Sequence, residues 1–169
     1  GHVPGFPTHV DFAYIDGANL HKGVADLGWK LDYKRFRIWL KDKFRVERAY
    51  LFIGLVPENK DLYTKLQEFG YILVYKEVTY DGNGKVKGNC DADLVLRTVC
   101  DTYENAFDKA VLVSSDGDYS GLVKFLMERK RLKTILSPAT AQKCSILLKR
   151  TEANIVYIND QRTLLRWSK

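Results

Sequence analysis

Short apolar runs alternate along this chain with stretches in which apolar residues recur every three or four positions. The short runs predict buried strands at residues 10–15, 48–54, 71–76, 110–114, 133–136 and 155–158. The spaced residues between them are typical of amphipathic helices. Strands that alternate with helices predict a mostly parallel sheet, covered by helices on both faces and joined by right-handed crossovers. The expected fold class is therefore a doubly wound α/β domain.

The predicted helices carry start and stop signals. The first begins near residue 18, where Asn19 is a candidate cap. Asp32 is expected to cap a helix that runs to Phe44, and Gly70 to end a helix over residues 57–69. Further helices are expected over residues 91–103, 119–130, 141–150 and 160–167, the last capped by Asn159 or Asp160.

The chain is expected to form one domain over residues 10–169, preceded by a disordered tag remnant at residues 1–9. Within the domain, glycines in residues 78–88 predict a hairpin or flap. The apolar stretches are broken by charge well short of the roughly 18 residues of a membrane span. The three cysteines fit neither a CxxC pair nor a disulfide framework, and the three histidines form no cluster typical of zinc. We expect a soluble protein of the reducing cytoplasm with no membrane partner.

Aspartates stand where several predicted strands end and helices begin. Asp16 ends the first strand, Asp91 opens a helix, and Asp116 and Asp118 follow the strand at residues 110–114. In α/β proteins the carboxyl ends of parallel strands form the crevice in which ligands bind, so these acids can converge. Each acid alone is also explained as a turn or cap residue. Carboxylates crowded together need a cation, and oxygen-only ligation selects Mg²⁺ or Mn²⁺.

Only one of the two acids at the start of the helix over residues 91–103 is expected in this crevice. Asp91 and Asp93 are about 200° apart around a regular helix. Arg97 follows Asp93 by four residues, the spacing of a surface ion pair. We therefore assign Asp91 to the site and Asp93 to the surface.

The net charge of +6 is unevenly distributed. Residues 124–150 contain eight bases against one acid, Glu128, and a second basic stretch covers residues 30–48. Such a field attracts polyanions, nucleic acid above all, in a salt-sensitive way. Solvated helix faces are the alternative explanation.

Three segments in order resemble the motifs of NYN domains, the LabA-like branch of the PIN-like nucleases. They are YIDGAN at residues 14–19, KGNCDADL at 87–94 and VLVSSDGDY at 111–119. The resemblance implies a PIN-like three-layer sandwich and a metal-dependent ribonuclease site. In that site Asp16, Asp91 and Asp116 would be the central acids and metal ligands, assisted by Asn19 and Asp118, and Ser114 would contact ligand or water. Two positions depart from the family pattern: Ser115 replaces a usual glycine, and Cys90 replaces an aliphatic residue.

This reading predicts RNA, most simply single-stranded RNA, as the partner. Bound Mg²⁺ or Mn²⁺ would activate water for phosphodiester cleavage. Tyr80 and Tyr119 are candidates for stacking on bases, with ordinary packing as the alternative. Flanking phosphates would contact bases of the loops and helix faces, namely Lys85, Lys87, Lys124, Lys130 and Lys149.

Two other functions remain open at this stage. One is an RNA-binding module of the same fold that no longer cuts. The other is a phosphate-handling or nucleotide-binding α/β enzyme that acts on a small molecule. The sequence contains neither a GxGxxG nor a GxxxxGK[ST] motif, which argues against it. The sequence leaves open whether the protein forms a homodimer and whether it acts as an endonuclease or an exonuclease.

Overall fold

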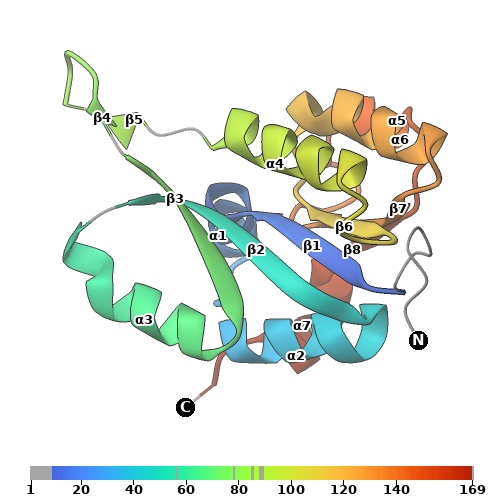
Figure 1. The fold of residues 1–169 in the computed structure, drawn as a ribbon. Coiled ribbons are helices and arrows are strands. Elements are labelled where there is room, and N and C mark those ends of the chain that lie inside the picture. Colours follow the sequence, from blue (N-terminus) through green and yellow to red (C-terminus); the bar gives the residue numbers. More distant parts are fainter. Residues whose placement is uncertain (1–8, 56, 78, 85, 88–89, 169) are drawn as a thin grey trace.

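A six-stranded parallel sheet forms the centre of the protein (Figure 1). The computed structural model describes residues 9–55, 57–77, 79–84, 86–87 and 90–168. The strand order is β3-β2-β1-β6-β7-β8, and each neighbouring pair in it is parallel. The strands are β1 (Asp11–Asp16), β2 (Val46–Leu55), β3 (Tyr71–Glu77), β6 (Ala110–Val113), β7 (Leu132–Ser137) and β8 (Ile155–Tyr157). The predicted fold class is confirmed.

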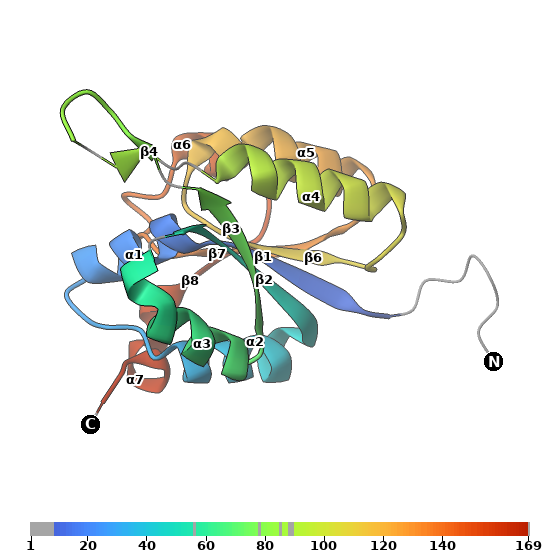
Figure 2. The same ribbon diagram turned by 60° about the vertical axis from the view of Figure 1, so that its left-hand side comes forward.

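Helices cover both faces of this sheet (Figures 1 and 2). One face carries α1 (Gly17–Asp26), α2 (Tyr33–Phe44), α3 (Lys60–Glu68) and α7 (Arg162–Leu165). The other carries α4 (Asp91–Tyr103), α5 (Ser120–Glu128) and α6 (Ile146–Lys149). Short 3-10 segments precede α3, α5 and α7, namely η1 (Pro57–Asn59), η2 (Gly117–Tyr119) and η3 (Ile158–Gln161). Within the part of the chain that the structure describes, no helix is long and apolar enough to cross a membrane.

The two layers of core follow from the alternation of side chains along each strand. In β1, Ala13 and Ile15 pack under α1 and α2, whereas Phe12 and Tyr14 pack under α4 and α5. All six residues of β1 are buried. A strand buried on both faces reads as a continuous apolar run, which is why the sequence located β1 so clearly.

The direction of the chain reverses beside β1. From β1 the chain passes to β2 and β3 on one side and then returns through α4 to β6 on the other side. Such a reversal opens a crevice at the carboxyl ends of the strands, because the helices that follow them leave toward opposite faces. The end of β1 and the loop after β6 lie at this crevice.

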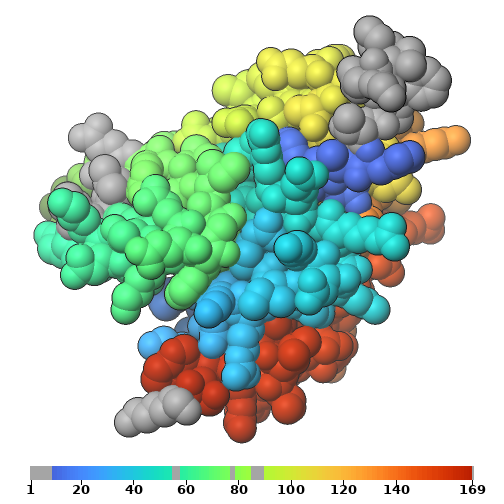
Figure 3. Space-filling model, turned by 60° about the horizontal axis from the view of Figure 1, so that its bottom comes forward, coloured from blue at the N-terminus to red at the C-terminus, as the bar shows by residue number. Residues whose placement is uncertain are grey.

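The α2 helix shows how the basic stretch at residues 30–48 is used. Asp32 caps it as predicted, because its carboxylate accepts a hydrogen bond from the Arg35 backbone N–H at 3.1 Å. Arg37 donates to the carbonyls of Val46, Glu47 and Gly70, which ties α2 to the starts of β2 and β3. Figure 3 shows the α2 segment at the centre of this face, between the α3 and α7 segments. At least part of this basic stretch is therefore structural.

The C-terminal helices are shorter than predicted. Residues 141–145 form turns instead of helix, because the Ser145 N–H donates to the Ser115 carbonyl and the Ser145 side chain caps α6. At the end of the chain, Asn159 accepts a hydrogen bond from the Trp29 indole at 2.9 Å and does not cap a helix. The Trp167 N–H donates to the Lys30 carbonyl, so α7 ends at Leu165. In each case a tertiary hydrogen bond replaces a helical one.

The predicted hairpin is present. β4 (Thr79–Tyr80) pairs with β5 (Val86–Lys87) in an antiparallel manner, and Figure 1 shows it projecting from the end of β3 beyond the sheet. The Tyr80 side chain is 67% exposed. Lys85 lies outside the described residues, as does the side chain of Lys87.

Replacing Gly17 by alanine should destabilise the fold by about 1–3 kcal/mol, the usual cost of overpacking. A Cβ there would lie 2.6 Å from the Ile53 methyl and 2.7 Å from the Phe52 carbonyl oxygen, so α1 would be pushed away from β2. Gly121 is the matched control, because a Cβ at that position in α5 meets nothing within 4 Å. Gly121→Ala should leave stability unchanged or slightly higher. Urea unfolding of both variants tests this, and equal midpoints would contradict it.

Candidate metal centre

Three carboxylates come together at the crevice beside β1. Asp16 is the last residue of β1, Asp91 is the first residue of α4, and Asp116 lies in the loop after β6. One oxygen of each residue lies within 4.8 Å of an oxygen of the other two. The parallel pairing of β1 with β6 brings the first and last together, since it aligns the carboxyl ends of the two strands. The structure thus brings together the three acids that the sequence assigned to a metal.

Local hydrogen bonds fix two of these carboxylates. The Asp16 carboxylate accepts from the Asn19 N–H at 3.1 Å and so caps α1. The Asp116 carboxylate accepts from the Asp118 N–H at 2.9 Å and caps η2. Each cap uses one oxygen and leaves the carboxylate held at the start of a helical turn, where N–H groups favour negative charge.

Tyr119 links Asp16 with Asp91. Its side chain is fully buried, and its hydroxyl lies 3.0 Å from one oxygen of Asp16 and 2.8 Å from one oxygen of Asp91. A phenol has one proton, so the two carboxylates share a single donor. Tyr119 cannot stack on a base in this position. The structure thus places the Tyr119 hydroxyl between two acids of the cluster and does not expose its ring for the predicted substrate contact.

Asn19 and Ser114 hold the turns that carry the acids. The Asn19 carboxamide oxygen accepts hydrogen bonds from the backbone N–H of Ser115 at 2.9 Å and from its hydroxyl at 3.2 Å. The fully buried Ser114 hydroxyl oxygen accepts from the Asp116 N–H at 3.1 Å. Ser114 is thus buried inside the turn, and its hydroxyl supports the loop that carries Asp116. Asn19 joins the start of α1 to the loop after β6.

The surroundings of Asp16 disfavour its negative charge. Burial raises the pKa of Asp16, and the neighbouring carboxylates of Asp91 and Asp116 raise it further, against the hydrogen bonds from Asn19 and Tyr119. Burial also raises the pKa of the Cys90 thiol to about 11, and Asp16 adds to that shift. Cys90 is therefore a thiol near neutral pH and a poor metal ligand. The available donors are carboxylate oxygens, which suit Mg²⁺ or Mn²⁺.

Asp93 lies outside the cluster, as predicted, but its ion pair is different. Its side chain is 47% exposed and lies 3.8 Å from the Lys76 ammonium. Arg97 instead pairs with Asp101 at 3.2 Å, and its guanidinium lies over the Tyr50 ring. The predicted pairing of Asp93 with Arg97 is wrong, because Asp101 is nearly buried and stands at the same four-residue spacing on the other side.

The predicted phosphate-contacting bases divide into two groups. Lys124 is exposed on α5, five residues after Tyr119, which is about 7.5 Å along a helix axis at 1.5 Å per residue. Lys149 is the last residue of α6, and α6 packs against η2. Lys130 follows the far end of α5, at the edge where β7 begins. Neighbouring bases at that edge are structural: Arg131 donates to the Phe107 carbonyl, and Lys133 pairs with Asp11. The structure does not bring Lys130 to the acidic cluster.

Asp118, which the resemblance predicted to assist the acids, is exposed on η2. Two bases near the acids carry no clear signal in the sequence. The first, Lys143, is exposed in the loop that Ser145 ties to Ser115. A base at the end of an edge strand, Lys76, reaches α4 through Asp93. These positions depend on which loops meet at the crevice, and only the tertiary structure specifies that.

Asp16→Asn should stabilise the metal-free protein near neutral pH by about 2–4 °C in the thermal midpoint, which corresponds to about 1 kcal/mol at this chain length. Asparagine still caps α1. The raised pKa of Asp16 means that the native state holds this proton more tightly than the unfolded chain. The protonated Asp16 carboxyl therefore stabilises the folded protein at low pH, and this contribution is lost as the pH rises through the native pKa of Asp16.

The stabilisation should therefore shrink as the pH is lowered toward 3.8, the ordinary value for aspartate. Asp118→Asn is the matched control, because Asp118 is exposed and outside the cluster, and its midpoint should not change. Thermal unfolding in EDTA from pH 4.5 to 8 measures both. A lower midpoint for Asp16→Asn at every pH would show that the carboxylate stabilises the metal-free fold.

Comparison with known proteins adds the family to this geometry. The chain is 26% identical, over 134 residues, to the low amplitude and bright protein LabA of Synechococcus elongatus, with 73% of this chain and 71% of that protein covered. A crystal structure of a Vibrio parahaemolyticus protein of unknown function has the same fold, with a TM-score of 0.75 and 22% identity over 94% of this chain and 98% of that one.

The family match covers the whole site. It runs from residue 13 to residue 159 and so includes β1, α4, the loop after β6 and all three clustered acids. NYN domains are part of the PIN-like superfamily, which includes nucleases. The chain belongs to the NYN domain family.

Proposed function

We propose that this protein is a divalent-metal-dependent ribonuclease that cleaves single-stranded RNA. The observation that carries the proposal is the convergence of Asp16, Asp91 and Asp116 at the strand carboxyl ends, with oxygens within 4.8 Å of one another. Three carboxylates at that spacing, one of them buried, repel each other unless a cation is bound. Membership of a family related to nucleases supports phosphodiester cleavage as the chemistry.

Asp16, Asp91 and Asp116 would hold the ion, which when bound would polarise the phosphodiester and lower the pKa of a water molecule. Tyr119 and Asn19 orient the acids, since each is hydrogen-bonded to the cluster or to the turn that carries Asp116. Asp118 is exposed beside the cluster, and we assign it the acceptance of a proton from the attacking water. Preorganised ligands of this kind need little rearrangement during the reaction.

The RNA partner is supported by the charge of the rim. Lys124, Lys143 and Lys149 belong to elements that begin at or pack against the acidic turn, and the net charge of the chain is +6. Tyr80 extends an exposed ring from the hairpin, where it can stack on an unpaired base. Lys85 and Lys87 of the same hairpin would contact flanking phosphates.

Asp116→Asn should abolish Mn²⁺-dependent cleavage of a fluorescent single-stranded RNA, with a rate loss of at least about 100-fold. Asp93→Asn is the control, because it removes a carboxylate from the start of α4 without touching the cluster. Its rate should stay near that of the wild type. Folding of each variant is checked by thermal unfolding.

If the wild-type protein binds RNA but does not cut it with Mn²⁺ or Mg²⁺, the ribonuclease proposal is wrong and the protein is an RNA-binding module of the same fold. RNA affinity that is unchanged by EDTA and by Asp116→Asn would strengthen that conclusion. Cleavage by Asp116→Asn at the wild-type rate would remove the metal-site argument altogether.

Replacing both Lys124 and Lys143 by alanine should weaken RNA binding and flatten its salt dependence by about 1.4 in log–log slope, at about 0.7 per phosphate contact. KM should rise more than kcat falls. The control is a double replacement of Arg129 and Lys130, which stand at the opposite end of α5. Fluorescence anisotropy at several salt concentrations measures both slopes. Equal slopes for the two double variants would place the RNA path elsewhere.

A further inference from the structure

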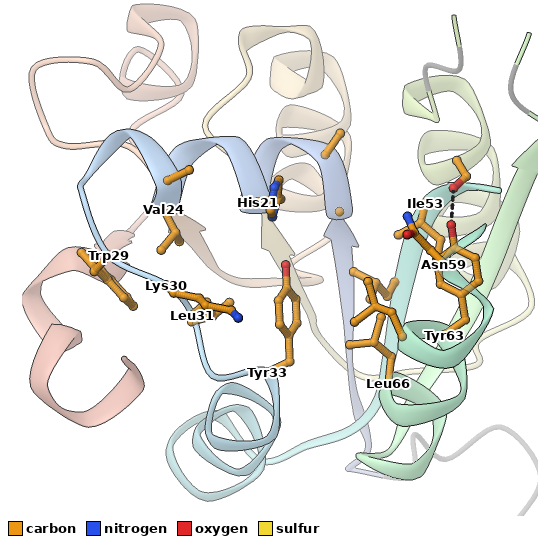
Figure 4. A pocket seen from close by; sticks show the side chains of 16 residues that line it. His21, Val24, Trp29, Lys30, Leu31, Tyr33, Ile53, Asn59, Tyr63 and Leu66 are labelled. Carbon is orange, nitrogen blue, oxygen red and sulfur yellow. Dashed lines mark hydrogen bonds between the residues drawn. The ribbon is translucent and has the colours of Figure 1, made fainter. Parts of the chain in front are cut away.

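An apolar cavity of about 590 Å³ lies on the face of the sheet that carries α1 and α3 (Figure 4). Leu51 and Ile53 of β2 form its floor, α1 lines one side, and α3 lines the other with Leu62 and Leu66. Trp29 lines it from the segment after α1. The volume is within the range of about 300–1,000 Å³ for small-ligand sites.

The cavity exists because the facing stripe of α1 is short of side-chain volume. Five residues of α1 line the cavity, and three of them are glycine or alanine; the five are Gly17, Ala18, His21, Val24 and Ala25. At the near end, Gly17 presses α1 onto β2, since a Cβ there would collide with Ile53. Further along, the alanines leave the space toward α3 unfilled. The cavity is thus built by the sequence of α1.

Three residues that line this cavity make no side-chain hydrogen bond to another described residue: Tyr33 is partly buried, and His21 and Asn59 are exposed at its rim. Figure 4 shows the Tyr33 hydroxyl pointing toward His21, with Ile53 and Leu66 across the cavity. Burial raises the pKa of Tyr33 to about 12, so its hydroxyl remains a donor at neutral pH. A ligand with flat apolar faces and a polar edge would match this lining.

One end of the cavity begins at the residue that follows Asp16 of the acidic cluster. Gly17 and Ala18, which line its near end, directly follow Asp16. Consecutive Cα atoms are 3.8 Å apart, so the backbone at this end of the cavity adjoins that of Asp16. Lys30 lines the other end and adds a positive charge. A nucleotide with its phosphate at the acids can therefore direct its base into the cavity.

We propose that this cavity binds one unpaired nucleobase of the RNA, adjacent to the phosphate held at the acidic cluster. The proposal rests on the ribonuclease function and adds a base-binding subsite to it. Single-stranded RNA is recognised through splayed bases that stack on aromatic rings and hydrogen-bond along their edges. Here Trp29 and Tyr33 supply the rings, and Tyr33, His21 and Asn59 supply the edge contacts.

The test compares two fluorescein-labelled ribose-phosphate hexamers, one with bases and one abasic, in the Asp116→Asn background so that neither is cut. The base-bearing RNA should bind about tenfold more tightly, as expected for stacking of a base. Ala25→Leu fills the cavity from α1 and should remove most of that preference without lowering the affinity for the abasic hexamer. Gln67→Leu, which adds the same side chain to an exposed position of α3 outside the cavity, should keep it.

Tyr33→Phe provides a second variant that changes no volume. It should lower the affinity for base-bearing RNA about threefold or more and leave the abasic hexamer unchanged. If folded Ala25→Leu and Tyr33→Phe both keep the wild-type preference, the subsite is overturned. A change in oligomeric state on Ala25→Leu, with RNA binding unaltered, would assign the cavity to a protein partner and also overturn it.

Cleavage by the wild type separates this inference from the proposed function. Mn²⁺-dependent cleavage that is indifferent to Ala25→Leu and to an abasic position overturns the subsite and leaves the ribonuclease intact. A base preference that Ala25→Leu removes, without any cleavage, supports the subsite and removes the nuclease. Absence of both binding and cleavage overturns both.

Discussion

The mutual repulsion of three carboxylates is the constraint on which the rest of the site depends. Asp16 and Asp116 cannot move apart, because each caps a helical turn, and the strands before them are held side by side by the β1–β6 pairing. Tyr119 offers one proton to two of the acids. Backbone hydrogen bonds thus keep together charges that would separate in water, and a cation is the simplest group that offsets their repulsion.

The same loops that fix the acids also connect the two layers of helices. Asn19 of α1 accepts from Ser115, and the Ser115 carbonyl accepts from Ser145 before α6, so one short loop joins elements on opposite faces of the sheet. Gly117 fits against Ser145, where a Cβ would approach the hydroxyl to 2.4 Å. The contacts of Ser115 with Asn19 and Ser145, and of Gly117 with Ser145, are all made at the carboxyl ends of the strands. They therefore hold the loop that carries Asp116 in place.

Much of the fold could be predicted from the sequence, because strands buried on both faces read as apolar runs and Asp32 capped α2 as its position indicated. The convergence of the three acids could be predicted because each stands where a strand ends or a helix begins, and the carboxyl ends of parallel strands form one crevice. The role of Tyr119 could not be predicted, since only tertiary packing turns its hydroxyl inward. Arg97 had two acids at equal spacing, and burial of Asp101 decided the pairing. The helix predicted at residues 141–150 shortened because Ser145 is bonded to a loop distant in sequence.

The distribution of bases shows why net charge alone does not locate a binding surface. Arg131 and Lys133 add to the positive charge of residues 124–150, yet their hydrogen bonds tie down carbonyls and Asp11 at the edge opposite the acids. Arg37 is used in the same way on α2. Bases that pair within the fold contribute less to the field around a phosphate than exposed ones such as Lys124 and Lys143. All strands of the sheet run in the same direction, so the three clustered acids lie at their carboxyl ends and these structural bases lie near their amino ends. The direction of the strands therefore determines where a polyanion can approach.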